Sequence, residues 1–402
     1  MDMTTRGRSG PVASLAEWLA IAVAGRLSVG RLDLGLPTGR RSVIAGRKAG
    51  LAAELEIRDW RTLSRLLAGG GVGFAEAYVD GCWDTADLDD LLLLLALNQE
   101  ALGTSRRRHP WRHVARLVDR LRRDGSRDSA RRDIAYHYDL GNEFYGHWLD
   151  EAMTYSAGIF ERPDDGLAAA QANKFRRIAD IAEIRAAHQV LEIGCGWGGF
   201  ACWLAREIGC RVTAITISDA QFAFASARVQ QEGLGDRVEI RRQDYRDVAG
   251  QFDRVASIEM FEAVGERDWP VFFGALRQRL KPDGRAALQI ITIADDAFER
   301  YRRGVDFIQK YIFPGGMLPS MAALRREVGQ AGLRWSRDDA FGLHYARTLA
   351  VWRQRFEAAW PQIGRLGFDE RFRRLWRYYL VYCETGFRVG RIDVRQIALQ
   401  PS

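Results

Sequence analysis

From residue 186 onward, short apolar runs alternate with segments in which apolar residues recur every three or four positions. The first pattern predicts buried strands and the second predicts amphipathic helices. The predicted strands are Gln189–Ile193, Arg211–Ile217, Val238–Arg241, Phe252–Ile258 and Gly284–Ile293. The predicted helices are Phe200–Glu207, Ala220–Gln231, Trp269–Leu280 and Ala322–Ala331. Because strands and helices alternate, we expect an α/β fold with a doubly wound parallel sheet flanked by helices.

Residues 13–102 carry a different pattern, which predicts a small domain of mixed helices and strands. Alternating positions predict strands at Leu32–Pro37 and Ala52–Arg58, with a turn region rich in Gly and Arg between them. The predicted helices are Trp18–Gly25, Trp60–Leu67 and Asp84–Leu97, with Gly69–Gly71 as a break after the second. The apolar run Leu91–Leu97 is far short of the roughly 20 residues that cross a bilayer, so we expect any membrane role to be peripheral.

The composition is that of a folded globular protein and excludes a wholly disordered or collagen-like chain: 402 residues, 47% apolar and 28% charged. This length suggests two or three domains. The five cysteines form no CxxC pair, which argues against a disulfide scaffold and a structural zinc site, and we expect no bound metal. A reducing cytoplasm is the simplest compartment for such a chain.

Basic residues are concentrated between Arg106 and Arg132, where eleven arginines against three aspartates leave a local net charge of +8, above the +7 of the whole chain. Helical spacing gathers arginines on one face and Trp111 with three aliphatic residues on another. This pattern suits an anionic membrane surface, and it fits a solvated linker equally well. We expect no nucleic-acid partner, since the rest of the chain lacks a known nucleic-acid motif.

The stretch Val190–Gly199 is the most informative in the chain, because a buried strand runs into a glycine-rich turn and then into a helix. Its glycines match the dinucleotide pattern GxGxxG, which raises the alternative of an NAD enzyme. The second strand, however, ends in Thr216-Ile217-Ser218 rather than in an acidic residue that would bind a ribose. Glu192, directly before Ile193 and the first glycine, is typical of an S-adenosylmethionine site, and we favour this interpretation.

Several further motifs lie in order along the chain. They are Gly73–Gly81, Tyr136–Asp139, Met153–Ser156, Gln243–Asp247, Gln309–Gly316 and Phe341–Tyr345. With the glycine loop, these residues resemble the cyclopropane-fatty-acyl-phospholipid synthase family over nearly the full chain. The resemblance implies a Rossmann-like S-adenosylmethionine-dependent methyltransferase fold with a smaller N-terminal α+β lipid-engaging domain. It implies a lipid-engaging domain over 1–102, a basic linker over 103–132 and a catalytic domain over 133–402.

The same resemblance assigns a cofactor site by position. The residues that would line the S-adenosylmethionine site are Tyr155, Ser156, Glu192, Gly194, Gly196, Thr216, Gln221, Asp244 and Tyr245. Ordinary structural roles stay open for some of them: Gln221 as a residue at a helix start, and Tyr155 and Tyr245 as core aromatics.

The chain departs from the family where a bicarbonate ion is bound in cyclopropane synthases. The family builds that cage from Cys, Glu, His, Ile and Tyr. In this chain Ala157 and Gln289 replace the Cys and the His, while Glu262, Ile291 and Tyr345 match the other three residues. The two replacements are expected to weaken bicarbonate binding. Glu259 stands where the family usually has Gly. These features resemble the branch of the family that makes mid-chain methyl-branched fatty acids of the tuberculostearic type.

The chemistry implied is methyl transfer to an alkene, a weak nucleophile that must be held in line with the sulfonium methyl and kept dry. The transfer leaves a carbocation on the acyl chain, and a base then decides the product. Loss of a proton from a chain carbon, or from the new methyl without ring closure, gives a methylated or methylene alkene. Loss of a proton from the new methyl with ring closure gives the alternative product, a cyclopropane. The expected catalytic residues are Glu262, Glu259, Tyr345 and Gln289, with Glu262 the first candidate to take the proton.

The resemblance also implies partners and a location. We expect unsaturated phospholipids at an anionic membrane surface as substrates, and a cytoplasmic protein held peripherally at the inner face of the cell membrane. A separate redox enzyme would reduce the product or oxidise it, for example toward a methylated furan acid, and a homodimer would fit the family. Two other classes stay open at this point: a lipid-binding protein without catalysis, and a nucleic-acid-binding factor that uses the basic segment.

Overall fold

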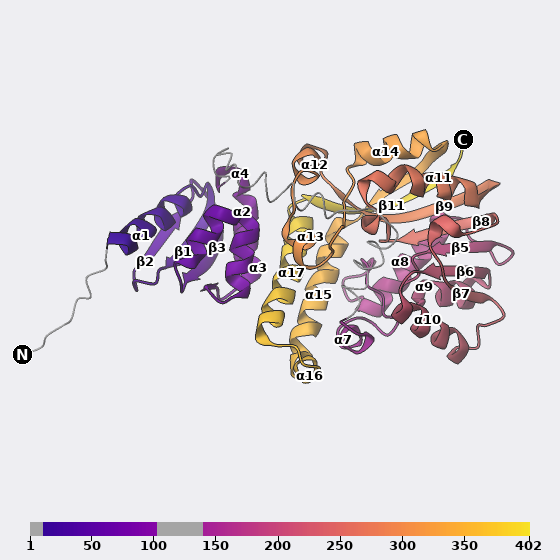
Figure 1. The fold of residues 1–402 in the computed structure, drawn as a ribbon, viewed down its shortest axis with the longest axis horizontal. Helices are drawn as coiled ribbons and strands as arrows, with labels where there is room; N and C mark the ends of the chain where they lie inside the picture. The colour runs from indigo at the N-terminus through magenta and orange to yellow at the C-terminus, as the bar shows by residue number, and fades with distance from the viewer. Residues whose placement is uncertain (1–10, 103–139) are drawn as a thin grey trace, which may run out of the picture. The chain divides into compact units, whose positions relative to one another are not determined.

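The computed structural model describes residues 11–102 and 140–402 (Figure 1). These residues form two compact units: residues 11–102 with Phe368–Val389, and residues 140–367 with Gly390–Ser402. The predicted basic linker at 103–132 and the motif Tyr136–Asp139 lie outside the described residues. No helix in the described part of the chain is both long and apolar enough to cross a bilayer.

A seven-stranded sheet forms the centre of the second unit, in the order β10-β11-β9-β8-β5-β6-β7 (Figure 1). The strands are β5 (Gln189–Ile193), β6 (Arg211–Thr216), β7 (Val238–Arg242), β8 (Phe252–Ile258), β9 (Leu280–Ile293), β10 (Leu333–Ala340) and β11 (Ile392–Pro401). The α/β class is confirmed. The expectation of a wholly parallel sheet is wrong at one side, because β11 pairs antiparallel with both β9 and β10.

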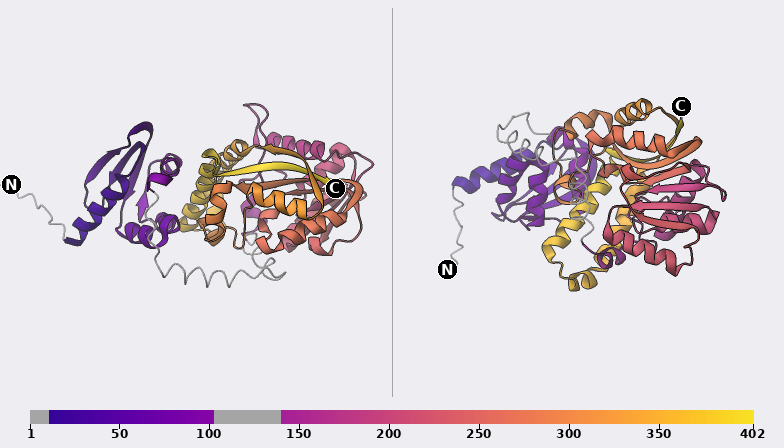
Figure 2. Two further views of the ribbon diagram at one scale, coloured as in Figure 1. Left: turned by 90° about the horizontal axis from the view of Figure 1, so that it is seen from above. Right: turned by 45° about the vertical axis from the view of Figure 1, so that its right-hand side comes forward.

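Helices cover both faces of this sheet (Figures 1 and 2). The helices described in this unit, not all of which touch the sheet, are α7 (Asn142–Gly146), α8 (Leu167–Ile181), α9 (Gly199–Trp203), α10 (Asp219–Gln231), α11 (Trp269–Arg279), α12 (Asp295–Tyr301), α13 (Phe307–Tyr311), α14 (Met321–Gln330), α15 (Gly342–Ala358) and α16 (Trp360–Arg365). Successive strand residues enter different hydrophobic clusters: Leu191 belongs to one and Val190 to the other. This alternation is the reason why the strands read as continuous apolar runs, since both faces of the sheet are buried.

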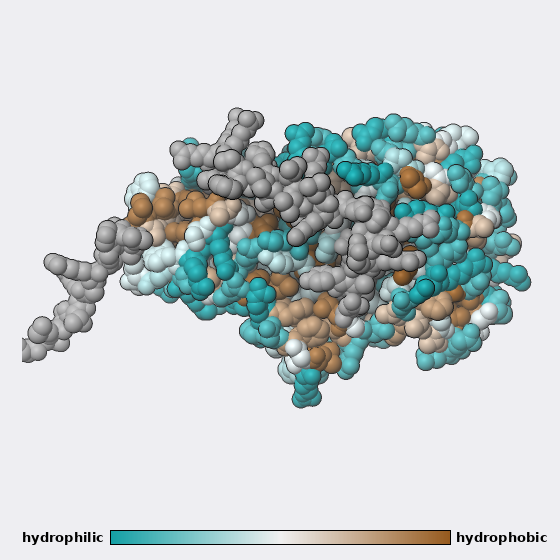
Figure 3. All heavy atoms as spheres, viewed as in Figure 1, coloured by the Kyte–Doolittle hydropathy of each residue, from teal (hydrophilic) through white to brown (hydrophobic). Residues whose placement is uncertain are grey.

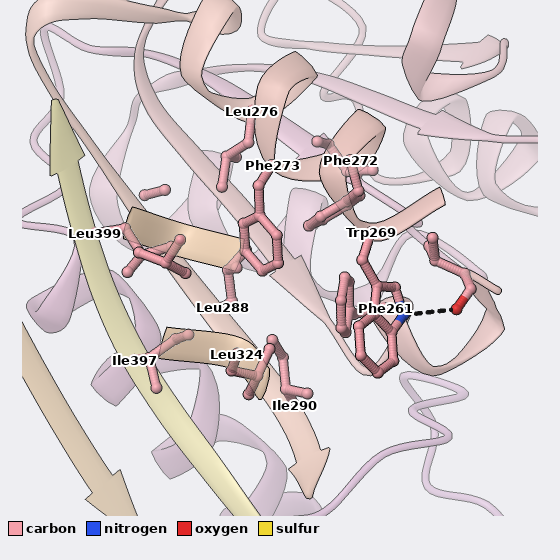
Figure 4. Close-up of a cluster of buried hydrophobic side chains, with 14 of the residues drawn as sticks. Phe261, Trp269, Phe272, Phe273, Leu276, Leu288, Ile290, Leu324, Ile397 and Leu399 are labelled. Atoms are coloured by element: carbon pink, nitrogen blue, oxygen red, sulfur yellow. Dashed lines mark hydrogen bonds between the residues drawn. The ribbon is translucent and has the colours of Figure 1, made fainter. Parts of the chain in front are cut away.

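One of these clusters anchors the segment that follows β8. Phe261 is almost fully buried, and its ring lies 5.0–5.6 Å from the rings of Trp269, Phe272 and Phe273 (Figure 4). Trp269 donates its indole N–H to the carbonyl oxygen of Val264, 3.0 Å away. The aromatic core therefore holds the turn after β8 in place through the side chain of Phe261. This turn also carries Glu259 and Glu262.

The first unit is built on a four-stranded sheet in the order β2-β1-β3-β4. Its elements are α1 (Pro11–Ala24), β1 (Val29–Gly35), β2 (Arg41–Ala45), β3 (Lys48–Ile57), α2 (Arg61–Val79), β4 (Trp83–Asp84), α3 (Leu88–Leu97) and α4 (Gln99–Leu102). The expected break after the second helix is confirmed at Gly70, whose φ of 60° interrupts α2.

Two expectations for the first unit need correction. The turn region expected before the second strand contains β2, which alternates exposed and half-buried residues and so lacks an apolar signal. The helix expected from Asp84 begins at Leu88, because Asp84 belongs to β4. Asp87 then caps the helix by accepting the backbone N–H of Asp90.

Helix α17 (Glu370–Arg388) completes the first unit although it lies near the end of the chain. Arg374 donates to the carbonyl oxygens of Tyr78 and Trp83 at 2.7 and 3.0 Å, and its guanidinium lies 3.9 Å from the centre of the Tyr78 ring. Arg371 forms an exposed ion pair with Asp80 at 2.9 Å. The predicted domain limits, 1–102, 103–132 and 133–402, do not place this helix with the first unit. These limits stay a prediction, because residues 103–139 are not described.

We predict that Arg374→Leu lowers the free energy of unfolding by about 2 kcal/mol, since it leaves two buried carbonyl oxygens without their donor. The matched control is Arg371→Leu, which removes only an exposed ion pair and should cost less than about 1 kcal/mol. Chemical denaturation of the full chain, followed by tryptophan fluorescence, measures both. Equal losses in the two variants would contradict this role for Arg374.

Candidate functional site

The glycine loop begins where β5 ends and leads into α9. Gly194 has a φ of 83°, and a Cβ at this position would lie 2.5 Å from the side chain of Met260. A side chain would therefore clash, and the bare glycine backbone lets the loop approach the turn after β8 closely. The backbone N–H groups of Gly194 and Cys195 also donate to the carbonyl oxygen of Ile215 on β6. The loop thus meets the carboxyl ends of three neighbouring parallel strands.

Glu192 lies one residue before the end of β5 and is 2% exposed. One of its carboxyl oxygens, Oε2, is buried with no hydrogen-bond partner among the described residues. Burial raises the pKa of Glu192 to about 8, opposed by the nearby charge of Lys174. A buried acceptor without a donor is costly unless a ligand supplies one. The site therefore fits a ligand that brings a cation or hydroxyl donors.

Thr216 and Gln221 occupy the carboxyl end of β6 and the first turn of α10. The Thr216 hydroxyl donates to Gln221 Oε1 at 2.8 Å. The Ser218 side chain caps α10 by accepting the backbone N–H of Gln221. The structure thus brings these predicted residues beside the glycine loop, while Gln221 also serves the helix start that was the alternative for it.

Asp244 and Tyr245 follow β7 at the same edge of the sheet. Asp244 accepts three hydrogen bonds from Arg246, one from its backbone N–H and two from its guanidinium, at 2.7–2.9 Å. The Tyr245 ring packs edge-on against Phe272 with centroids 5.4 Å apart. Both residues therefore have partners within the protein, and the Asp244 carboxylate is oriented by Arg246.

Tyr155 and Ser156 come from the segment between α7 and α8. The Tyr155 ring lies in a cluster of aromatic side chains and is 5.3 Å from the ring of Trp352. Ser156 is buried and accepts a 2.6 Å hydrogen bond from the ammonium group of Lys174. Lys174 is fully buried on α8, and burial lowers its pKa to about 8 against the attraction of Glu259, Asp150 and Glu192.

Sequence reasoning missed Lys174, although one signal was present. The lysine occupies the apolar face of a helix whose neighbouring residues Phe175 and Ile178 belong to the core. A buried lysine is rare unless it is paired. It interacts electrostatically with several buried carboxyl groups, which makes it the central cation of this region.

Glu259 directly follows β8 and has a φ of 49°, a left-handed conformation that favours glycine. Its Oε1 accepts the backbone N–H of Ala157 at 2.9 Å and Nε2 of Gln289 at 2.7 Å. Its Oε2 accepts the hydroxyl of Tyr345 at 2.7 Å. Burial raises the pKa of Glu259 above its ordinary value, and these donors and the charge of Lys174 oppose this rise only in part. The structure thus joins three of the predicted catalytic residues, Glu259, Gln289 and Tyr345, in one cluster.

Glu262 lies on the other side of Phe261 and is held differently. Its Oε1 accepts the backbone N–H of Ile291, and its Oε2 is buried with no partner in the described part of the chain. Burial, with a smaller contribution from Glu259, raises the pKa of Glu262 to about 8. The raised pKa favours the protonated form of this carboxyl group, so that the two neighbouring glutamates need not both be charged.

A comparison with known proteins connects this geometry to a family. The family model for mycolic acid cyclopropane synthetase matches residues 125–397. The chain is 44% identical over 338 residues to tuberculostearic acid methyltransferase UfaA1 of Mycobacterium tuberculosis, covering 82% of this chain and 79% of that protein. It is 35% identical over 350 residues to cyclopropane-fatty-acyl-phospholipid synthase of Escherichia coli K12, covering 86% and 87%.

The fold is likewise similar to a solved structure, mycolic acid cyclopropane synthase CmaA1 complexed with SAH and CTAB. The TM-score is 0.64 at 29% identity, and the match covers 67% of this chain and 98% of that one. The predicted family and the predicted Rossmann-like methyltransferase fold are confirmed by these similarities.

The raised pKa of Glu262 predicts a pH dependence of stability. The folded protein holds this proton more tightly than the unfolded chain, so the contribution to stability is complete below pH 4.5 and is lost as the pH rises through about 8. Glu262→Gln stays neutral throughout. We therefore expect the variant to gain thermal stability relative to the parent between about pH 5 and about pH 9, by roughly 2–4 °C for each kcal/mol.

Thermal unfolding midpoints of the two proteins at both pH values test this expectation. The control is Asp236→Asn, which removes a carboxylate with an exposed side chain and should show the pH response of the parent. A difference between Glu262→Gln and its parent that stays constant with pH would contradict the assignment.

Proposed function

Because this chain belongs to the mycolic acid cyclopropane synthetase family of S-adenosylmethionine-dependent methyltransferases, we propose that it methylates the double bond of unsaturated phospholipid acyl chains. The product is a methyl-branched or methylene-branched acyl chain. The observation that carries this choice of product is the carboxylate of Glu259, held by Ala157, Gln289 and Tyr345. The name of the relative UfaA1, a tuberculostearic acid methyltransferase, agrees with it.

The residues at the carboxyl ends of β5, β6 and β7 fit S-adenosylmethionine, which supplies an electrophilic methyl group when bound. Glu192 offers a buried acceptor without a partner, and the glycine loop offers bare backbone. We assign Tyr155, Ser156, Glu192, Gly194, Gly196, Thr216, Gln221, Asp244 and Tyr245 to this site. Burial raises the pKa of Glu192 to about 8, and a positively charged sulfonium nearby would favour its ionised form.

Aromatic side chains connect this site to the carboxylate cluster. The ring of Trp352 lies 5.3 Å from that of Tyr155 and 6.0 Å, edge-on, from that of Tyr345. The faces of such rings are electron-rich and stabilise a cation nearby. With S-adenosylmethionine bound, transfer of its methyl group to one alkene carbon would break the C–S bond, and these rings would stabilise the charge that develops on the other alkene carbon.

Glu259 is the group that removes the proton in this proposal. A carboxylate has about four acceptor positions, three of those on Glu259 are filled, and the remaining one belongs to Oε2. Three donors favour the ionised form of Glu259 against the burial that raises its pKa, whereas Glu262 has fewer donors and its pKa, raised to about 8, favours its protonated form. The contacts therefore favour Glu259 over Glu262, which the residue types alone had put first.

Loss of the proton to Glu259 leaves a carbon–carbon double bond in the methylated chain. A separate redox enzyme would then reduce this product to a saturated branch or oxidise it, for example toward a methylated furan acid. The alternative is cyclopropane formation at the same double bond, which the similarity to the Escherichia coli synthase supports. Ala157 and Gln289, which replace the Cys and His of the bicarbonate cage, speak against that alternative.

Access to such a substrate requires contact with a membrane, and the first unit offers hydrophobic side chains for it. Leu15 and Trp18 on α1 and Val43 on β2 are each 58–65% exposed. Figure 3 shows hydrophobic residues gathered on the visible face of this unit. We propose peripheral attachment to the cytoplasmic face of an anionic membrane through this unit, and a homodimer as the assembly.

The direct test is to incubate the purified protein with S-adenosylmethionine and vesicles of a monounsaturated phospholipid, and to identify the acyl products by mass spectrometry. We expect a mass gain of one methylene unit with a double bond that survives and is reducible by hydrogenation. A cyclopropane product would overturn the choice of product, and an unchanged lipid would overturn the proposed function.

Glu259→Gln is predicted to lower the rate of product formation by about 100-fold or more, because an amide cannot take the proton. The matched control is Glu262→Gln, which replaces a group that is already neutral and should cost less than about 10-fold. The rates of both are measured near pH 7 with saturating S-adenosylmethionine. A near-normal rate for Glu259→Gln, or a larger loss of rate for Glu262→Gln than for Glu259→Gln, would contradict Glu259 as the base and favour Glu262.

A further inference from the structure

A second buried glutamine lies behind the carboxylate cluster. Gln396 is fully buried on β11, directly opposite Gln289 in the antiparallel pairing of β11 with β9. Its Nε2 donates to Gln289 Oε1 at 2.9 Å. Gln289, also fully buried, donates in turn from its Nε2 to Glu259 Oε1 at 2.7 Å. The two amides thus form a short hydrogen-bonded row that ends on the carboxylate.

Contacts at both ends of the Gln289 amide set the direction of this row: its Nε2 donates to Glu259 and, at 3.4 Å, to the carbonyl oxygen of Ala157, and its Oε1 accepts from Gln396. If the amide of Gln289 were turned over, its oxygen would face the Glu259 carboxylate and its NH₂ group would face the NH₂ group of Gln396. Both contacts would be repulsive, so the observed orientation presents a donor to an ionised Glu259. Without Gln396, the oxygen of the Gln289 amide loses its donor, and the observed orientation of this amide is less stable. A protonated Glu259 could then donate to the oxygen of a turned Gln289 amide.

A purely structural role explains Gln396 poorly. Its Oε1 is buried with no hydrogen-bond partner among the described residues, and an unsatisfied buried amide oxygen lowers stability. The residues on its own face of β11, Val394 and Ala398, are buried and apolar, and an apolar side chain at position 396 would avoid this cost. The contact with Gln289 is the feature that an apolar residue would lose.

We propose that Gln396 is a positioning residue that keeps the amide donor of Gln289 directed at Glu259 and so holds this carboxylate ionised. The inference rests on the proposed role of Glu259 as the base, but the orientation of the amides does not depend on the identity of the substrate. It assigns to β11, one of two strands of the seven-stranded sheet that the sequence pattern did not predict, a part in the chemistry at the end of β8.

The test uses Gln396→Met, which keeps the volume of the side chain and removes its donor. We expect the pKa of Glu259 to rise by about one unit, since the ionised form loses an oriented hydrogen bond. The value is measured by carbon-13 NMR titration of protein labelled at the glutamate carboxyl groups, with the Glu259 signal identified by its absence in Glu259→Gln. The acid limb of the pH–rate profile should move to higher pH by the same amount.

Three comparisons make the result decisive. Gln400→Met, on the same strand, should leave the Glu259 titration unchanged. Gln289→Met should raise the Glu259 pKa as well, and the double variant should add nothing further, because Gln396 acts through Gln289. Gln396→Asn withdraws the amide with a smaller change of polarity, and it serves if Gln396→Met does not fold.

An unchanged Glu259 titration in Gln396→Met, or additive shifts in the double variant, would overturn the inference. The titration requires no turnover. If the parent protein left unsaturated phospholipid unmodified while Gln396→Met still shifted the Glu259 titration, the proposed function would fall and the positioning role would stand.

Discussion

The second unit depends on one constraint, the burial of the Glu259 carboxylate at a backbone position suited to glycine. The left-handed φ of 49° and the loss of solvation both oppose this arrangement. Three donors offset the cost, and they come from the segment before α8, from β9 and from α15 through Ala157, Gln289 and Tyr345. Each of these elements must therefore keep its place for the carboxylate to be tolerated.

The buried charges around the Glu259 carboxylate must also be balanced. Lys174 is a fully buried cation that interacts with Glu259, Glu192 and Asp150, and these are more acidic groups than one lysine balances. Protonation of some carboxyl groups reduces the imbalance, as the raised pKa values of Glu192 and Glu262 indicate. A bound sulfonium and a transient carbocation are the cationic species that such a region would stabilise. The same buried carboxyl groups would then stabilise both the bound sulfonium and the carbocation formed during catalysis.

The sequence predicted the strands that are apolar on both faces, and with them the positions of Glu192 near the end of β5 and of Glu259 directly after β8. It did not predict β10, because its charged residues belong to an edge strand and give no apolar signal. The contact of Gln396 with Gln289 depends on the register of β11, which no local pattern contains. Lys174 was overlooked because a single lysine in an amphipathic helix normally faces solvent. These features depend on contacts between residues far apart in the sequence, which the periodicity of apolar residues does not predict.

The central claim is that a carboxylate carried by the chain itself, at Glu259, does the work of the base. Chemical rescue tests it most directly. Glu259→Gly suits the left-handed backbone and leaves the donors of Ala157, Gln289 and Tyr345 around a small space. The account predicts that this variant is inactive on unsaturated phospholipid and that added formate restores product formation in proportion to its concentration. An active Glu259→Gly variant without formate, or one that no small carboxylate restores, would contradict the account.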